Sequence, residues 1–522
     1  MTRIVICFPW FSSHVRWVVC SILLVCFVLL MGIIVVPIVA PRPLPPTSVH
    51  VTIDAQKALG TLSTMSVGLN VATFDEHLLS EKAQTAIKNA GVGLLRFPGG
   101  LDSDLYHWQS HTLEKGKSDP NNTFDAYMSV VQKVGAQSMI TVDYGAGSVA
   151  EAAGWVQYAN KGGPGYAGPV PTYAGGSHTG HTYGIKYWEI GNENYGDGTY
   201  GISWENNRHA PGPLPYARSV VAYSHAMKAI DPTIHIGAVL TTPGTWPDGN
   251  TNPLSRRPWN QTLLSTACSA IDFVILHWYA QNPGNESDAV LLSSTQQVAA
   301  MVATVRDEIQ RDCGSHAREV QIMVTETNSV SYQPGKQTVS LVNALFLADD
   351  YMTWLEHGAA NVDWWNLHDW NVYLFNNSSS LYGDAHFGDY GILSTGLCAG
   401  SICEPAADTP FPPYYALQML RYLGRPGDMM VAARSDQTLV TVHAVKQAHG
   451  DLALLLINKD PDTYSTVSLN LKGYTAKGKT TVYTYGKKSS ALTSTPGSVA
   501  QIKLAPYSLT TIVFSPEVAT FG

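Results

Sequence analysis

Charged residues are scarce in this chain, since Asp, Glu, Lys and Arg make up only 14% of its 522 residues. Soluble proteins average about a quarter. Apolar residues reach 45%. Chains that stay disordered combine low apolar content with high charge, so the composition excludes an intrinsically disordered protein. Long apolar runs are also scarce: only residues 17–40 form an uncharged stretch long enough to cross a bilayer, which excludes a polytopic membrane protein.

Basic residues are the second shortage. The chain has 32 Lys and Arg against 40 Asp and Glu, a net charge of −8. Residues 1–42 hold three arginines and no acid, so the remainder carries 29 basic and 40 acidic residues, a net charge of −11. An acidic surface repels phosphate backbones, and nucleic acid is therefore not an expected partner.

The apolar stretch belongs to an N-terminal segment, residues 1–46, that ends in a Pro-rich linker. Its 24 uncharged residues suit a transmembrane anchor, because secretory signals have apolar cores of about 7–15 residues. Arg3 and Arg16 precede the stretch, which places the bulk of the chain outside. We expect a protein on the extracellular side of the membrane, attached through this segment only. Cleavage after Ala40 and secretion is the alternative.

Cysteine is sparse as well. Three of the seven cysteines lie in the N-terminal segment, and four remain: Cys268, Cys313, Cys398 and Cys403. An even number outside the cell permits two disulfides, and Cys398 and Cys403 could close a small loop. None of the four has zinc-ligand spacing, so we expect them to be structural.

Neither a cofactor nor a metal is expected. Residues 145–150, GAGSVA, fit a dinucleotide-binding fingerprint, but no acid occurs between Glu151 and Glu189, where that fingerprint requires one about 20 residues on. His178 and His181 have H-x-x-H spacing without a third ligand nearby.

Eight apolar, β-rich runs alternate with amphipathic helical patterns between residues 61 and 425. The runs occupy residues 65–71, 92–97, 138–144, 185–191, 234–240, 272–279, 320–327 and 361–367. Nearly continuous apolar runs are typical of parallel strands that are covered on both faces. Eight successive units favour an α/β fold with a closed (β/α)₈ TIM barrel, and a doubly wound sheet is the alternative.

From residue 426 to residue 522 the pattern changes to strands without helices. Turns rich in Gly, Asp, Asn and Pro separate them, which is typical of an antiparallel β-sandwich. Residues 47–60 form an isolated strand pattern before the barrel, and we expect this strand to pair with the sandwich.

Two glutamates lie at the ends of predicted barrel strands. Glu193 follows the fourth strand directly after Asn192, and Glu326 ends the seventh. In a closed barrel these strand ends meet at one face. Glycoside hydrolysis needs two carboxyl groups there, one to protonate the leaving oxygen and one to attack the anomeric carbon. A single glutamate would more simply form a salt bridge, but the pair favours catalysis.

The motifs around these glutamates resemble a known family. LLRFPGG (94–100), YWEIGNENYGDGTYG (187–201) and ILHWYA (275–280) resemble the α-L-arabinofuranosidase branch of the clan-A retaining glycoside hydrolases. Relatives of that branch include the β-xylosidase and β-glucuronidase/heparanase types. The similarity covers barrel and sandwich, roughly residues 48–517.

The resemblance implies a role for each matching residue. Glu193 corresponds to the acid/base and Glu326 to the nucleophile. Asn192 would bind the sugar 2-hydroxyl, Arg96 would keep the nucleophile ionised, and Tyr279 would orient it. Because an acid must keep its proton near neutral pH, we expect a raised pKa for Glu193. A structural ion pair inside the barrel is the alternative for Arg96.

Further substrate-binding candidates follow other strands. Trp364 and Trp365 are neighbours at the eighth strand, and strand alternation lets only one of them line the pocket. His277 and Tyr279 either face the substrate or are simply packed. Asp143 follows the third strand and would bind hydroxyls or cap its loop.

Together these features predict a retaining, double-displacement glycoside hydrolase acting on oligosaccharides or on plant-type or other extracellular polysaccharides. α-L-Arabinofuranosidase activity leads, and a β-glucuronidase or β-xylosidase type is the alternative. A non-catalytic sugar-binding protein on the same scaffold is the alternative from another class. The retaining mechanism predicts carboxyl groups about 5–5.5 Å apart.

Overall fold

The computed structural model describes residues 46–114, 117–118, 122–162, 182–244, 258–374, 385–497 and 502–516. All of them fall in one unit, Pro46–Gly522. The apolar stretch that was expected to anchor the protein, and the pair His178 and His181, lie outside the described residues. In the described part, no helix is both long and apolar enough to cross a bilayer.

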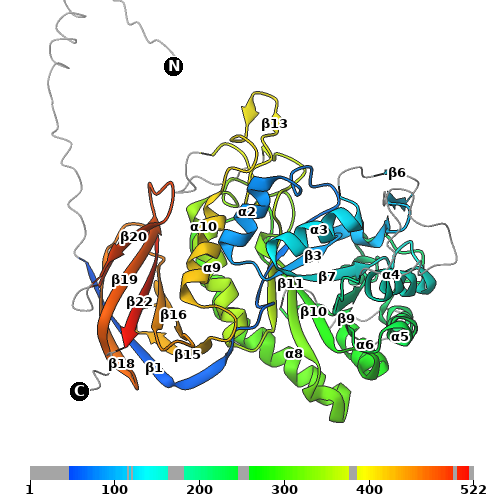
Figure 1. Cartoon of the computed structure of the whole chain (residues 1–522), viewed down its shortest axis with the longest axis horizontal. Coiled ribbons are helices and arrows are strands. Elements are labelled where there is room, and N and C mark those ends of the chain that lie inside the picture. Colours follow the sequence, from blue (N-terminus) through cyan, green and yellow to red (C-terminus); the bar gives the residue numbers. More distant parts are fainter. Residues whose placement is uncertain are drawn as a thin grey trace, which may run out of the picture. The chain divides into compact units, whose positions relative to one another are not determined.

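Eight parallel strands close into a barrel (Figure 1). In order around the barrel they are β2 (Val67–Asn70), β3 (Leu94–Phe97), β7 (Gln137–Val142), β8 (Tyr187–Ile190), β9 (His235–Val239), β10 (Phe273–Gln281), β11 (Gln321–Val330) and β12 (Asn361–Trp364). The last strand pairs with the first, with Val362 opposite Val67. This closure confirms the barrel and makes the doubly wound alternative wrong.

Helices cover the outside of the barrel. They are α2 (Glu81–Ala90), α3 (Phe124–Val134), α4 (Val149–Lys161), α5 (Pro213–Ile230), α6 (Trp259–Ala267), α7 (Asp288–Ser294), α8 (Val298–Cys313), α9 (Leu341–Glu356) and α10 (Pro412–Leu423). Local signals define their ends: Ser80 caps α2 by accepting from Ala83 N–H, and Gly91 ends it at a φ of 76°. The strands and helices share one apolar core, rich in buried tryptophans such as Trp278 and Trp354, whose rings lie 5.8 Å apart.

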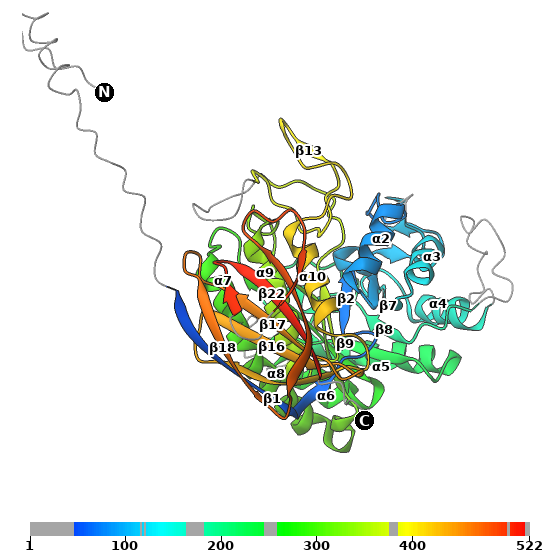
Figure 2. The ribbon, with the colours of Figure 1, turned by 60° about the vertical axis from the view of Figure 1, so that its left-hand side comes forward.

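The second domain is a nine-stranded, mostly antiparallel sheet. Its strands are β1 (Thr47–Thr61), β15 (Met429–Ser435), β16 (Val440–Lys446), β17 (Leu452–Asn458), β18 (Ser465–Lys472), β19 (Ala476–Gly486), β20 (Thr493–Pro496), β21 (Ile502–Leu504) and β22 (Ser508–Pro516). β1 comes from the start of the chain and lies between β15, with which it is antiparallel, and β18, with which it is parallel. Figure 2 shows this blue strand among the orange and red ones.

β17 is buried on both faces, because the sheet also packs against the barrel. Leu454 and Leu456 belong to the core of the sheet, whereas Leu455 and Ile457 belong to the core of the barrel. A strand covered on both sides reads as a continuous apolar run, which is what residues 452–457 show.

A buried ionic cluster joins the two domains. Asp349 on α9 accepts hydrogen bonds from His443 Nε2 of β16 at 3.0 Å and from Lys459 Nζ at 2.8 Å. His443 Nδ1 also lies 3.0 Å from Glu356 Oε1. Burial opposes the charge on His443, but the two carboxylates outweigh it and raise the pKa of His443 to about 10.

Two disulfides are present. Cys268, directly after α6, pairs with Cys313 at the end of α8, and Cys398 pairs with Cys403. The second closes the hairpin of β13 (Cys398–Ala399) and β14 (Ile402–Cys403).

Candidate active site

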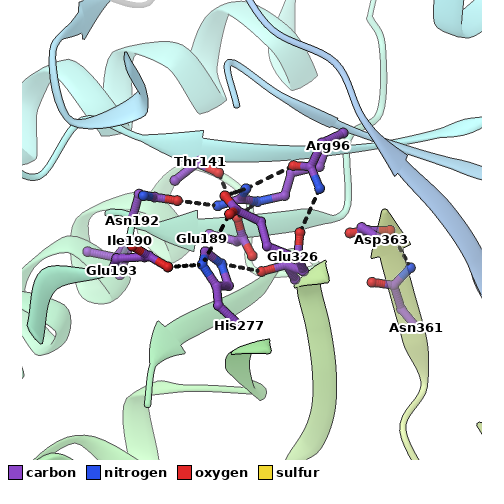
Figure 3. Close-up of polar contacts among 12 residues, drawn as sticks. Arg96, Thr141, Glu189, Ile190, Asn192, Glu193, His277, Glu326, Asn361 and Asp363 are labelled. Atoms are coloured by element: carbon purple, nitrogen blue, oxygen red, sulfur yellow. Dashed lines mark hydrogen bonds and ion pairs between the residues drawn. The ribbon is translucent and has the colours of Figure 1, made fainter. Parts of the chain in front are cut away.

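Glu193 and Glu326 meet at the carboxyl ends of the barrel strands (Figure 3). Glu193 follows β8, after a turn in which Gly191 has a φ of 73°. A Cβ at Gly191 would lie 2.3 Å from Oδ1 of Asn194, so this position requires glycine. Glu326 lies in β11 opposite His277 of β10.

The two carboxylates are close enough for a retaining mechanism. An oxygen of Glu193 and an oxygen of Glu326 lie within 4.8 Å of one another. Inverting enzymes keep their carboxyl groups about 6.5–9.5 Å apart to admit a water, whereas retaining enzymes keep them at about 5–5.5 Å. The spacing at this site matches the retaining class.

Three side chains contact the Glu326 carboxylate. Arg96 Nη1 donates to Oε1 at 2.9 Å, and the Tyr279 hydroxyl donates to Oε2 at 2.7 Å. His277 Nδ1 lies 3.5 Å from Oε2. The two hydrogen bonds, one of them from a guanidinium, fix the position of this carboxylate.

Arg96 also binds a second carboxylate inside the barrel, which the sequence analysis missed. Its Nε donates to Glu189 Oε2 at 2.5 Å, and Thr141 Oγ1 donates to the same oxygen at 2.6 Å. The structural ion pair that was the alternative for Arg96 is therefore present together with its contact to Glu326. The sequence contains a signal for this pair, because Glu189 and Arg96 each interrupt an otherwise apolar barrel strand. A buried charge needs a partner of opposite charge, so the two residues could have been predicted to pair.

Glu193 does not have the raised pKa that its role as an acid led us to expect. Burial acts in the expected direction, but the hydrogen bond and charge of His277, with hydrogen bonds from Trp204 and Tyr195, outweigh it. The distances are 2.9 Å to His277 Nδ1, 2.8 Å to Trp204 Nε1 and 3.2 Å to the Tyr195 hydroxyl. The pKa of Glu193 is therefore lowered in the ligand-free protein.

His277 joins the two carboxylates rather than merely filling space. Figure 3 shows its ring between them, with Nδ1 facing both. Its other nitrogen, Nε2, lies 3.1 Å from Thr325 Oγ1. Both ring nitrogens thus have polar partners, which fixes the ring orientation.

Asn192 is held at both ends of its amide. Its Oδ1 accepts from Arg96 Nη2 at 2.9 Å, and its Nδ2 donates to Glu205 Oε1 at 2.8 Å. Its backbone N–H donates to Asp104 Oδ2 at 3.2 Å. Glu205 was missed by the sequence analysis, because it lies on a loop without strand periodicity.

The two neighbouring tryptophans separate as strand alternation requires. Trp364 is 0% exposed and packs its ring on Phe346 and Tyr351 of α9, so its assignment as a substrate-binding residue is wrong. Trp365 faces the other way and is half-buried, with its ring beside Gly100, three residues beyond the end of β3. Of the two rings, only that of Trp365 can reach a substrate.

Asp143 occupies a loop next to the site. Its Oδ1 accepts from Ala146 N–H at 2.7 Å, which caps the turn after β7. Its Oδ2 lies 3.8 Å from His107 Nδ1. Burial raises the pKa of Asp143 to about 7. These contacts favour the loop-capping interpretation over hydroxyl binding.

The described residues hold one group whose ligand atoms would suit a metal, namely Glu193, His277 and Glu326. Each of these atoms already accepts or donates a hydrogen bond within the site. Their spacing is equally what acid/base and nucleophile require, so no metal is needed to explain them.

Comparison with known proteins points in the same direction. No family model matches the chain. The intracellular exo-α-(1→5)-L-arabinofuranosidase of Bifidobacterium longum is 25% identical over 283 residues, 49% of this chain and 45% of that protein. The probable α-L-arabinofuranosidase C of Aspergillus terreus is 22% identical over 261 residues, 47% of this chain and 49% of that protein. The resemblance to the α-L-arabinofuranosidases is confirmed. The chain spans about half the length of these curated relatives.

The structural similarity to arabinofuranosidases covers more of this chain than the sequence alignments do. The crystal structure of the Thermotoga maritima α-L-arabinofuranosidase in complex with arabinose has a TM-score of 0.67 at 19% identity, over 89% of this chain and 99% of that one. A Paenibacillus polymyxa xyloglucanase of family 44 has a TM-score of 0.62 at 13% identity, over 90% of this chain and all of that one. At such identities the likeness shows the fold, a barrel with a C-terminal sandwich.

Proposed function

We propose that the protein is a retaining glycoside hydrolase that works by double displacement. One observation carries the proposal: Glu193, which follows β8, and Glu326, which lies within β11, have carboxylate oxygens within 4.8 Å of each other, and their surroundings differ. Glu326 is bound by a guanidinium and a phenol, whereas Glu193 is bound by an imidazole, an indole and a phenol. Unlike partners around two close carboxyl groups are what divides them into nucleophile and acid/base.

In the first step Glu326 attacks the anomeric carbon. Arg96 and Tyr279 hold the carboxylate in position through hydrogen bonds, and Glu193 gives its proton to the leaving oxygen. Because the pKa of Glu193 is lowered in the free protein, the proton must be taken up as substrate enters. A substrate that displaces water and separates His277 from Glu193 would raise that pKa.

In the second step Glu193 acts as a base. It removes a proton from a water molecule, which attacks the anomeric carbon and releases Glu326. The hydrogen bonds that hold Glu193 ionised in the free state, from His277 and Trp204, favour this half of the reaction. The sugar leaves with its original configuration after two inversions.

The substrate class that fits best is an α-L-arabinofuranoside at the end of an oligosaccharide or polysaccharide. The support comes from the two relatives above, both named as arabinofuranosidases. A β-glucuronide is less suited, because the buried guanidinium of Arg96 is taken by Glu189 and Glu326 and is not offered to a sugar carboxylate. β-Xylosides remain the alternative, and a non-catalytic sugar-binding protein would have no use for two ionisable groups at this spacing.

For location, we propose that the protein works on the extracellular side of the membrane, or is secreted after cleavage. The uncharged stretch of residues 17–40 and the pairs Cys268–Cys313 and Cys398–Cys403 support this, because disulfides persist in oxidising compartments. Protease treatment of intact cells that express the protein with a C-terminal epitope tests this location. We expect the protease to digest the epitope from outside the cell, and full protection of the epitope would contradict the proposal.

A panel of nitrophenyl glycosides tests the activity. We expect release of nitrophenol from the α-L-arabinofuranoside at a kcat/KM at least tenfold above that for the β-xyloside and β-glucuronide. Glu326→Ala, prepared in parallel, controls for contaminating hydrolases. Activity on none of the substrates, with sugar binding retained, would favour the binding-protein alternative.

A further inference from the structure

Glu205 is a buried carboxyl group that the double-displacement mechanism does not use. It is 6% exposed and lies on the loop that returns to the site after β8. Its backbone N–H and that of Trp204 both donate to Gly196 O, at 3.1 and 3.0 Å. The loop therefore folds back on the short 3₁₀ helix η3 (Asn194–Gly196) that follows Glu193.

The loop brings two consecutive residues, Trp204 and Glu205, into contact with two consecutive residues of the site, Glu193 and Asn192. Trp204 Nε1 donates to Glu193 Oε2 at 2.8 Å, and Glu205 Oε1 accepts from Asn192 Nδ2 at 2.8 Å. The same loop thus supports both the expected acid/base and the expected sugar-binding amide.

The contact with Glu205 determines which way the Asn192 amide points. Arg96 can only donate, so the amide oxygen must face Arg96 and the amide nitrogen must face Glu205. Two hydrogens belong to that nitrogen, and Glu205 uses one. The second N–H is left to donate to another oxygen.

Burial of the Glu205 carboxyl group destabilises the fold, so packing alone does not explain a glutamate at this position. Its Oε2 is buried and has no hydrogen-bond partner among the described residues. Burial, together with the charges of Asp104 and Glu193, raises the pKa of Glu205 well above its usual value. An apolar side chain of similar size would avoid this cost, so the carboxyl group must serve its one partner, Asn192.

We propose that Glu205 is a positioning residue, which holds the Asn192 amide so that its remaining N–H meets the 2-hydroxyl of the sugar. The inference rests on the proposed function. It adds a residue that acts on the 2-hydroxyl contact alone, and not on proton transfer.

Two substrates separate this role from a general structural one. Nitrophenyl α-L-arabinofuranoside carries the 2-hydroxyl, and its 2-deoxy analogue lacks it. For Glu205→Ala we expect kcat/KM to fall by about 10²-fold on the first substrate, as for a misplaced binding group, and to change less than threefold on the second. Glu205→Gln keeps an acceptor oxygen for Asn192 and is expected to recover most of the loss.

The chain offers a matched control. Glu308 of α8 is 7% exposed and accepts from Asn260 Nδ2 of α6 at 2.9 Å, which is the same buried Glu–Asn hydrogen bond outside the barrel. Glu308→Ala is expected to lower Tm while leaving the ratio of kcat/KM for the two substrates unchanged. If Glu205→Ala does not fold, Glu205→Asp, which withdraws the carboxyl group by one methylene, takes its place and is expected to lower the same ratio.

Equal losses on both substrates would overturn the inference, as would a wild-type enzyme that does not favour the 2-hydroxyl substrate. In either case hydrolysis by the wild type would leave the proposed function standing. Absence of hydrolysis by the wild type would instead remove the proposed function itself.

Discussion

His277 Nδ1 lies 2.9 Å from Glu193 Oε1. This contact explains why the pKa of the expected acid is lowered in the free protein, even though its partial burial acts in the opposite direction. The histidine stabilises the form of Glu193 that the second half of the reaction uses, and substrate must then help to protonate it for the first half.

Removing that contact should change how activity depends on pH. The pH profile of kcat/KM reports the free enzyme, where the pKa of Glu193 is lowered by His277. For His277→Gln we expect the basic limb to move to higher pH, because the charge of the imidazole no longer lowers the pKa of Glu193. His443→Gln, which removes another histidine held between two carboxylates, should leave the basic limb in place. A limb that stays fixed in His277→Gln would show that His277 does not lower the pKa of Glu193.

Glu193→Ala should discriminate between leaving groups. A dinitrophenyl glycoside needs little protonation, whereas a natural oligosaccharide needs the full help of the acid. General acid catalysis contributes about 10²–10⁴-fold, so single-turnover rates for the two substrates should separate by about that factor relative to the wild type. Equal losses on both would exclude Glu193 as the acid.

Replacing Trp364 should lower stability, whereas replacing Trp365 should weaken substrate binding. Trp364→Ala removes a fully buried ring and should cost about 3–5 kcal/mol of unfolding free energy, with kcat/KM per folded molecule unchanged. Trp365→Ala should leave Tm nearly constant and raise KM by about three- to tenfold, the worth of one stacking contact of about 0.5–1.5 kcal/mol. Chemical denaturation and initial rates measure the two effects, and a reversal of the pattern would show that the faces are assigned wrongly.

The contact between barrel and sandwich should weaken at alkaline pH. The pKa of His443 is raised to about 10 in the folded protein, against about 6.5 for an unfolded chain. The stabilisation is complete below about pH 6.5 and is lost as pH rises through about 10, because the folded state then gives up its extra proton. Tm should fall across this interval in the wild type and fall less in His443→Gln. If scanning calorimetry gives the same slope of Tm against pH for the wild type and for His443→Gln, the titration of His443 is not the cause of the weakening.

Much of the fold could be predicted from apolar runs. The run at residues 272–279 became β10 at Phe273–Gln281, and a similar agreement holds for the other barrel strands, because strands covered on both faces need apolar residues throughout. The parallel direction of β1 beside β18 could not be predicted, since no hairpin joins the two strands and fixes their relative direction.

The candidate site could be predicted only in part. Glu193 follows β8 as the sequence predicted, whereas Glu326 lies within β11, which continues to Val330 beyond the predicted end of that strand. Glu205 depends on how a loop folds back, which no periodicity reports. The pKa direction of Glu193 depends on donors from three separate segments, and only the folded chain shows that these donors outweigh burial.

The covalent intermediate on Glu326 tests the central claim most directly. Glu193→Ala, incubated with dinitrophenyl α-L-arabinofuranoside, should form the intermediate quickly and hydrolyse it slowly, because no base activates the water. Mass spectrometry of the rapidly quenched, digested protein should then find one sugar residue on the peptide that carries Glu326, and none in a Glu193→Ala/Glu326→Ala control. A sugar residue on a different side chain, or its complete absence while nitrophenol is still released, would contradict the double displacement proposed for these two glutamates.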